Sequence, residues 1–186
     1  MKRFLMIRLC SDLHLNHTNI LEYDPLRWVK YKTIEEMNEG IIHEIESTVK
    51  PEDDFIFLWD LAFWPRKSAE EYVQRIPGKK KRILWNHDGR EYTNLRKHFF
   101  SVQRNLYMDY RWYRIRLNHF PPVTQRVNYK VMPDILYIHW HTHKPNWSCN
   151  LFDISYNWWK LLYNLDDIID YAKENNSCKA VRNLSE

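Results

Sequence analysis

The first half of the chain alternates strand-like and helix-like patterns in the order that is typical of α/β proteins. Apolar runs of strand length lie at 3–10, 55–59 and 81–85, and polar or turn-forming residues bound each run. The segment between the first two runs opens with Thr33-Ile34-Glu35-Glu36, which has the form of a capping box. Apolar residues at helical spacing follow it: Ile34, Met37, Ile41, Ile42 and Ile45.

A second helix is predicted between the second and third apolar runs. Ser68-Ala69-Glu70-Glu71 has the same capping-box form, and Pro77-Gly78 is a typical helix end. The resulting strand–helix–strand–helix–strand order predicts a parallel sheet with right-handed crossovers.

The pattern changes after about residue 100. Tyr110–Leu117 alternates apolar and polar residues and is predicted to form one strand, Ile135–His139 another strand, and Asp166–Lys173 a last helix. We therefore expect an α/β fold, a mixed sheet with helices on its faces. Since there is no repeat, no low-complexity tract and no Gly/Ser-rich linker, we expect a single domain over 1–186.

Composition narrows the class of protein. The 186 residues are 44% hydrophobic and 28% charged, which is typical of a globular domain. No apolar run approaches the length of a membrane span, and the N-terminal segment lacks a small-residue cleavage site, so it is predicted to be a strand and not a signal peptide. The three cysteines, Cys10, Cys149 and Cys178, are too scattered for a disulfide framework. We therefore expect a cytoplasmic protein with no membrane partner.

The net charge of +4 is unevenly distributed. Residues 79–130 carry 13 Lys and Arg against three Asp and Glu, a local balance of +10. Two explanations remain open: a set of solvated strand and helix faces, or an electropositive surface beside a site for phosphates or nucleic acid.

Residues with metal-ligand chemistry follow the ends of most predicted strands. In an α/β sheet the carboxyl ends of parallel strands share one edge, where ligands bind. Each group alone has a structural explanation, as a helix cap, a turn or a strand face. Their recurrence at five strand ends argues for a common site. The groups are Asp12 and His14, then Asp60, then Asn86-His87-Asp88, then His119, then His141 and His143.

These five groups resemble the calcineurin-like metallophosphoesterase superfamily. Its pattern is D-x-H, G-D, G-N-H-D/E, H and G-H-x-H, and the ordered matches span nearly the whole chain. The segment 11–20 also resembles the S-D-x-H-F-G-H-x-N-I opening of small bacterial and phage members, and 157–168 resembles their C-terminal end.

The resemblance implies a fold, a metal centre and an activity. The fold would be a sandwich of two mixed β-sheets flanked by helices. The activity would be hydrolysis of phosphodiester or nucleotide-type substrates by a hydroxide generated on two divalent ions, and these N and O ligands suit Mn, Fe or Zn. Asp60 would bridge the two ions. The remaining ligands would be Asp12, His14 and His143 on one ion, and Asn86, His119 and His141 on the other.

The resemblance also implies roles beyond the metal ligands. His87 would protonate the leaving oxygen or stabilise the transition state, and Asp88 would orient His87. His17 on the first loop is either a contact to a substrate phosphate or an exposed loop histidine, and Arg90 is a second candidate contact to the substrate.

The chain departs from the family pattern at its glycines. Trp59, Trp85 and Trp140 stand where glycine precedes a ligand, and Asn16 replaces another glycine. The three indoles are expected near the edge formed by the strand ends, either packed into the sheet layers or crowding the metal pocket, and we expect crowding. The alternatives are a catalytically weak metal-bound module that binds anionic ligands or nucleic acid, and a scaffold with a vestigial site.

Overall fold

The fold contains two five-stranded sheets, and the first of them is mostly parallel. The computed structural model describes residues 6–58, 60–62, 66–84, 95–122, 132, 134–140, 147–148, 150–156 and 160–174. In the first sheet the strand order is β10-β1-β2-β3-β4, where β1 through β4 run parallel and β10 pairs antiparallel with β1. The strands are β1 (Ile7–Ser11), β2 (Asp54–Leu58), β3 (Lys79–Ile83), β4 (Ser101–Gln103) and β10 (Tyr163–Asn164).

The second sheet is mixed in a different way. Its order is β5-β6-β7-β9-β8, with an antiparallel hairpin at each edge and parallel pairs in the centre. The strands are β5 (Leu106–Tyr110), β6 (Tyr113–Leu117), β7 (Ile135–His139), β8 (Trp147–Ser148) and β9 (Leu151–Asp153). The structure therefore confirms an α/β fold, and it divides the strands between two mixed sheets.

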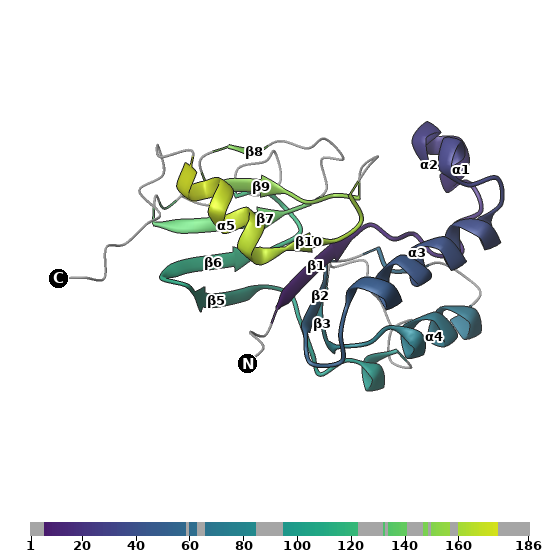
Figure 1. The fold of residues 1–186 in the computed structure, drawn as a ribbon, viewed down its shortest axis with the longest axis horizontal. Helices are drawn as coiled ribbons and strands as arrows, with labels where there is room; N and C mark the ends of the chain where they lie inside the picture. The colour runs from purple at the N-terminus through teal and green to yellow at the C-terminus, as the bar shows by residue number, and fades with distance from the viewer. Residues whose placement is uncertain are drawn as a thin grey trace.

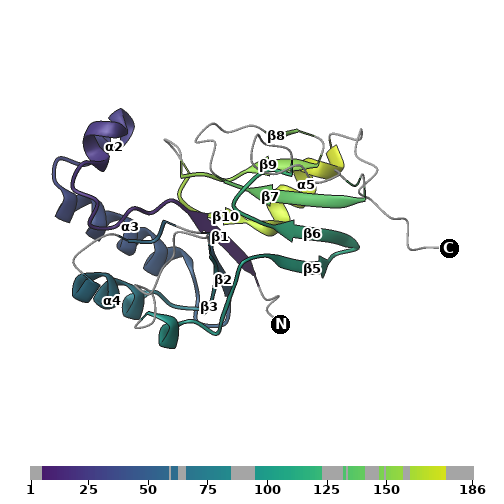
Figure 2. The same cartoon turned by 180° about the vertical axis from the view of Figure 1, so that it is seen from behind.

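The third and fourth helices cover the face of the first sheet that lies away from the second sheet, and the first two lie beyond one end of the third, as Figure 1 and the reverse view in Figure 2 show. The fifth follows β10 and packs into the core shared by the two sheets. No helix within the described ranges is long and apolar enough to cross a membrane. The helices are α1 (Ile20–Tyr23), α2 (Pro25–Lys30), α3 (Ile34–Thr48), α4 (Arg66–Arg75) and α5 (Leu165–Glu174), with a short 3-10 helix at Arg96–His98.

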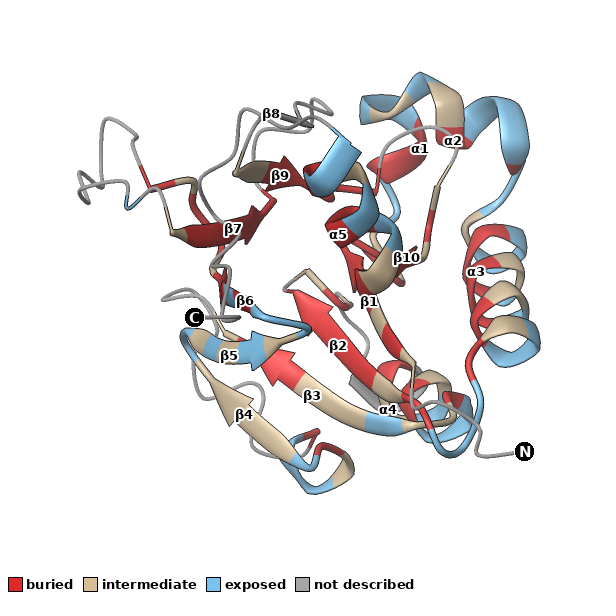
Figure 3. Ribbon diagram, turned by 60° about the vertical axis from the view of Figure 1, so that its left-hand side comes forward, coloured by how far each residue is buried: buried red, intermediate tan, exposed pale blue. Residues whose placement is uncertain are grey.

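Alternation along β2 shows how the layers form. Ile56 and Leu58 point into the core between the sheets, whereas Phe55 and Phe57 point into the core beneath the helices. A strand that is apolar on both faces is expected at the centre of such a layered fold. Figure 3 shows β2 and β7 almost entirely buried.

The predicted parallel strand–helix–strand order is confirmed, with one helix start corrected. The side chain of Thr33 caps α3 by accepting a hydrogen bond from the backbone N–H of Glu36 (3.1 Å). The predicted start at Ser68 is wrong, because α4 already begins at Arg66. A capping box is a local pattern, and it does not exclude an earlier start.

The prediction of one strand over Tyr110–Leu117 is also wrong. The chain reverses at Arg111 and Trp112, so β5 and β6 form a hairpin in which Tyr110 pairs with Tyr113. Both turn residues have positive φ, 46° and 72°. Such a turn normally carries Asn and Gly, and their absence here hid it from the sequence pattern.

Candidate metal centre

The candidate site lies where the chain leaves β1 and β2. The two segments remain paired beyond the strands: the N–H of His14 donates to the carbonyl of Asp60 (2.8 Å), and the N–H of Leu15 donates to the carbonyl of Leu61 (3.1 Å). Leu15 and Ala62 form a parallel bridge. This pairing places residues from two carboxyl ends side by side, as predicted for the ligand edge of a parallel sheet.

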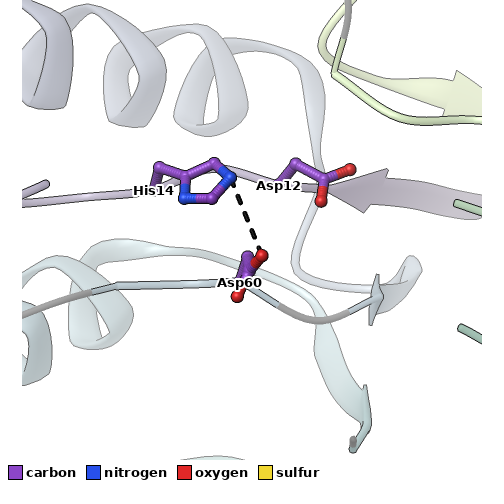
Figure 4. A group of neighbouring side chains, drawn as sticks. All are labelled: Asp12, His14 and Asp60. Atoms are coloured by element: carbon purple, nitrogen blue, oxygen red, sulfur yellow. Dashed lines mark ion pairs between the residues drawn. The ribbon is translucent and has the colours of Figure 1, made fainter. Parts of the chain in front are cut away.

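Three of the predicted ligands converge at this edge. One ligand atom from each of Asp12, His14 and Asp60 lies within 4.8 Å of the others. Figure 4 shows the group, with Nε2 of His14 3.7 Å from Oδ2 of Asp60. Asp12 and His14 are buried, and the side chain of Asp60 is 17% exposed. Two carboxylates in one partly buried site repel each other, and a bound cation would offset that repulsion.

The backbone at this group adopts an unfavourable conformation. Asp12 and His14 each have a φ of 52°, and Asp60 has a φ of 45°. For residues other than glycine the left-handed region costs about 1–2 kcal/mol per residue. Strain of this kind concentrates at functional sites, where the surrounding structure holds it in place. All three members of the group carry it.

Residues next to the group are held by Ile154, which follows β9, and by Asn38 of α3. The hydroxyl of Ser11 lies 2.6 Å from Oδ2 of Asp12 and 2.9 Å from the carbonyl oxygen of Ile154. The side chain of Asn38 donates to Oδ1 of Asn16 (2.8 Å) and accepts from the N–H of Asn16 (3.1 Å). Asn16, where the family pattern has glycine, has a φ of 63°, so these bonds stabilise a left-handed position.

Arg27 of α2 is a further supporting residue. Its guanidinium is buried and donates to the carbonyl oxygens of Asp12 and Leu13. Burial lowers the pKa of Arg27 from its ordinary value, while the nearby Tyr156 and Asp24 act against that shift.

Sequence reasoning missed Arg27 and Asn38 as parts of the site. For Asn38 a signal existed, since it is a polar residue on the apolar stripe of α3, one residue after Met37. For Arg27 no comparable signal exists, because arginine on a short helix is usually exposed.

His17 lies next to the ligand group. Its ring centroid is 5.6 Å from that of His14 and 6.0 Å from that of Tyr23. Burial and the positive charge of Arg27 lower the pKa of His17. His17, the predicted contact to the substrate, therefore lies near both the candidate ligand His14 and the exposed side chain of Tyr23.

His119 lies just beyond the carboxyl end of β6 and is almost completely buried. It is not a member of the group of mutually close ligand atoms. Its ring centroid is 4.5 Å from that of Phe120 and 5.3 Å from that of Trp140. Trp140 has no exposed surface and belongs to the core between the sheets. Trp140 therefore packs in the core between the sheets, while its ring also lies beside the candidate ligand His119.

His139, on β7, is paired within the structure. Its Nδ1 lies 3.7 Å from Oδ2 of Asp153, its register partner on β9, and both side chains are buried. The hydrogen bond from the N–H of Ser155 to Oδ1 of Asp153 (2.8 Å) further fixes that carboxylate.

The other predicted site residues lie outside the described residues. They are Asn86, His87, Asp88, Arg90, His141 and His143, together with Trp59 and Trp85.

The described donor atoms suit a divalent cation. Two carboxylates and one imidazole form a mixed O and N set without thiolate, which fits Mn²⁺, Fe²⁺ or Zn²⁺. The group has too few ligands to complete a site alone, and ligands from other strand ends or water would fill the remaining positions.

Comparisons with known proteins give relatives without an assigned function. No family model matches the chain. The crystal structure of the protein of unknown function AQ665 from Aquifex aeolicus has a TM-score of 0.69, covers 90% of this chain and 100% of its own, and is 22% identical, a likeness that extends to the fold alone. Uncharacterized protein MJ1445 from Methanocaldococcus jannaschii is 30% identical over 139 residues, which are 74% of this chain and 69% of that protein. The chain therefore belongs to the same family as uncharacterized protein MJ1445.

Proposed function

We propose that this protein is a metal-dependent phosphoesterase of the calcineurin-like type that hydrolyses phosphodiester or nucleotide-type substrates. One observation carries the proposal: Asp12, His14 and Asp60 bring their ligand atoms within 4.8 Å of one another at the carboxyl ends of adjacent parallel strands. The first two elements of the superfamily pattern, D-x-H and the aspartate of G-D, fall on these residues.

The arrangement of the sheets supports the same proposal. Two mixed sheets share an apolar core, and α3 and α4 cover the outer face of the first. The sandwich of two sheets flanked by helices that the resemblance to the superfamily implies would have this arrangement.

The proposed centre takes two divalent ions. Asp60 has two carboxylate oxygens to share and would bridge them; Asp12, His14 and His143 would complete one ion, and Asn86, His119 and His141 the other. When bound, such ions polarise phosphoryl oxygens and supply an activated water near neutral pH.

The chain's own residues would bind the substrate and move the proton. His17, whose ring lies beside that of His14, would contact a phosphate oxygen, and Arg90 would add a positive charge. His87 would donate a proton to the leaving oxygen, with Asp88 orienting its ring.

The direct test combines metal analysis with hydrolysis of bis(4-nitrophenyl) phosphate in the presence of Mn²⁺. We expect the purified protein to take up Mn²⁺ and to hydrolyse the diester, and Asp60→Asn to lose both properties. Asp54→Asn is the matched control, since Asp54 begins β2 and pairs with Lys81 (2.7 Å) instead of joining the ligand group. Protein that takes up no Mn²⁺, Zn²⁺ or Fe²⁺ would contradict the proposal.

A second variant separates chemistry from metal binding. His87→Ala should lower turnover by roughly 10²–10⁴-fold while the metal content stays close to that of the unsubstituted protein. Equal metal loss in His87→Ala and Asp60→Asn would show that His87 has a different role.

A second candidate function is binding of nucleic acid or another anionic ligand without hydrolysis. It is favoured by the exposed ring of Phe100, which has Nζ of Lys79 3.8 Å from its centroid, because exposed aromatic and basic side chains together are typical of single-strand binding. Against it, the neighbouring Lys81 and Lys97 pair with Asp54 and Glu70, which lowers the positive charge of this surface. Salt-dependent binding of an oligonucleotide without hydrolysis would favour this candidate.

A further inference from the structure

Arg27 makes an unusual set of contacts for a residue on a six-residue helix. Its side chain is buried, with 4% of its surface exposed. Nη1 donates to the carbonyl oxygen of Leu13 (2.8 Å), Nη2 donates to that of Asp12, and Nε donates to Oδ2 of Asp24 (3.1 Å). The guanidinium carbon lies 4.3 Å from the ring centroid of Tyr156. Each nitrogen of the guanidinium therefore donates a hydrogen bond, and the group lies over an aromatic ring.

The two carbonyl groups that Arg27 holds belong to the segment that carries the candidate ligands. They are the carbonyls of Asp12 and of Leu13, the residue immediately before His14, and both Asp12 and His14 have a φ of 52°. A single rigid fork on two successive carbonyls restricts the peptide groups on both sides of Leu13. That restriction opposes relaxation of the segment out of the left-handed region.

Asp24 allows the positive charge of Arg27 to lie close to a cation site. Its Oδ1 accepts from the N–H groups of Leu26 and Arg27 at the start of α2, and its Oδ2 accepts from the Arg27 side chain. Because Asp24 is paired with the guanidinium, its negative charge offsets part of the positive charge that Arg27 brings near the ligand group. Towards the site, Arg27 donates to the backbone carbonyl oxygens of Asp12 and Leu13, and its carboxylate partner is Asp24.

We propose that Arg27 is a positioning residue that holds Asp12 and His14 in the geometry needed for binding a divalent cation. The inference rests on the metal centre of the proposed function and adds to it a residue outside the ligand set. A lysine cannot take this role, because one ammonium group cannot span two carbonyls, pair with Asp24 and lie flat on Tyr156.

The test measures cation binding to the folded protein rather than activity. Co²⁺ titrations, followed by d–d absorption and calorimetry, would compare the unsubstituted protein with Arg27→Lys and Arg27→Met. The matched control is Arg75→Met, which removes an arginine that is paired with Glu39 and Glu46 on the surface. All titrations would be made well below each variant's melting temperature, so that loss of global stability does not enter the result.

We expect both Arg27 variants to bind Co²⁺ at least tenfold more weakly and to change the intensity and position of the absorption bands, whereas Arg75→Met matches the unsubstituted protein. Asp24→Asn keeps the fork and removes its counter-charge, so its loss of affinity should be smaller than that of Arg27→Met. If Arg27→Met does not fold, Arg27→Lys and Asp24→Asn carry the comparison.

Two results would overturn the inference, and they are distinguishable. If the unsubstituted protein binds Co²⁺ and the Arg27 variants bind it with equal affinity and an unchanged spectrum, the metal centre stands and Arg27 has no part in positioning it. If the unsubstituted protein binds no Co²⁺, Mn²⁺ or Zn²⁺, the metal centre itself fails, and the inference fails with it.

Discussion

The backbone N–H of His14 donates to the carbonyl oxygen of Asp60 (2.8 Å), and the side chains of the same two residues place an imidazole nitrogen and a carboxylate oxygen 3.7 Å apart. Their relative position is therefore set by the backbone, through a continuation of the pairing between β1 and β2. Short side chains on a fixed backbone lose little conformational freedom when they bind a ligand, which favours affinity.

Asp60→Asn should change the stability of the metal-free protein little, and it should greatly reduce the stability that the protein gains from Mn²⁺. Asn has the same shape and tolerates left-handed φ about as well as Asp, so the substitution mainly removes charge. Without metal we expect a change in the free energy of unfolding within about 1 kcal/mol, because lost repulsion from Asp12 offsets the lost contact with His14. With Mn²⁺ at about 100 times its Kd, the unsubstituted protein should gain about 2.7 kcal/mol and the variant much less. Thermal melts with Mn²⁺ and with chelator measure both quantities, and equal gains in the two proteins would argue against Asp60 as a ligand.

Trp140→Gly should destabilise the fold instead of opening the site. Trp140 has no exposed surface and packs in the core between the sheets, beside the ring of His119. Removing a buried Trp side chain leaves a cavity and costs about 3–5 kcal/mol. Denaturant unfolding measures the loss, and Trp112→Ala, which removes a largely exposed indole, is the control. A Trp140→Gly protein of unchanged stability and higher activity would instead support crowding of the pocket.

The turn between β5 and β6 offers a gain in stability. Trp112 is 71% exposed and has a φ of 72°, so its side chain contributes little packing while its backbone is strained. Trp112→Gly relieves about 1–2 kcal/mol of strain and loses about 0.4–1 kcal/mol through the greater freedom of the unfolded chain, for a net gain of about 0.5–1 kcal/mol. Trp112→Ala also removes the indole but keeps the strain, so it should show no gain. Urea unfolding of the two variants makes the comparison, and an equal rise of the midpoint in both would show that loss of the indole, and not relief of backbone strain, is the cause.

Periodicity along the chain predicted β1, β2 and β3 of the first sheet and the two main helices between them. It did not predict β4 and β10, which have three and two residues. The stripe of Met37, Ile41 and Ile45 predicted α3, and the apolar run at 55–59 predicted β2. The division of the strands between two sheets did not follow from periodicity, since each strand looks the same whichever sheet it joins. The hairpin at Arg111 and Trp112 was missed because its residues are atypical of such turns.

The candidate site was predictable where ligands follow strand ends. Asp12, His14 and Asp60 converge as expected from the edge rule for parallel sheets. Arg27 was not predictable, because its role depends on how α2 packs against the segment after β1, and no local pattern records that contact.

Tyr163 makes the stability of the protein sensitive to alkaline pH. It lies on β10, is 4% exposed, and burial together with the nearby carboxylate of Asp153 raises its pKa to about 12. An unfolded tyrosine ionises near pH 10, so between about pH 10 and 12 the unfolded chain loses a proton that the folded protein retains. The free energy of unfolding should therefore fall as pH rises through this window, by up to about 1.4 kcal/mol per pH unit from this residue alone.

Tyr163→Phe removes the ionisable group and should make the fall with pH shallower, whatever its effect on stability at neutral pH. Cys10 and Tyr156, whose pKa values burial also raises, contribute to the slope in both proteins and so cancel in the comparison. Tyr23→Phe is the matched control, because Tyr23 is 70% exposed and its loss should leave the slope unchanged. Denaturant unfolding at several pH values across the window gives the slopes, and absorbance at the tyrosinate band gives the ionisation directly. Equal slopes for Tyr163→Phe and the unsubstituted protein would show that Tyr163 ionises alike in the folded and unfolded states. Burial would then not raise the pKa of this residue.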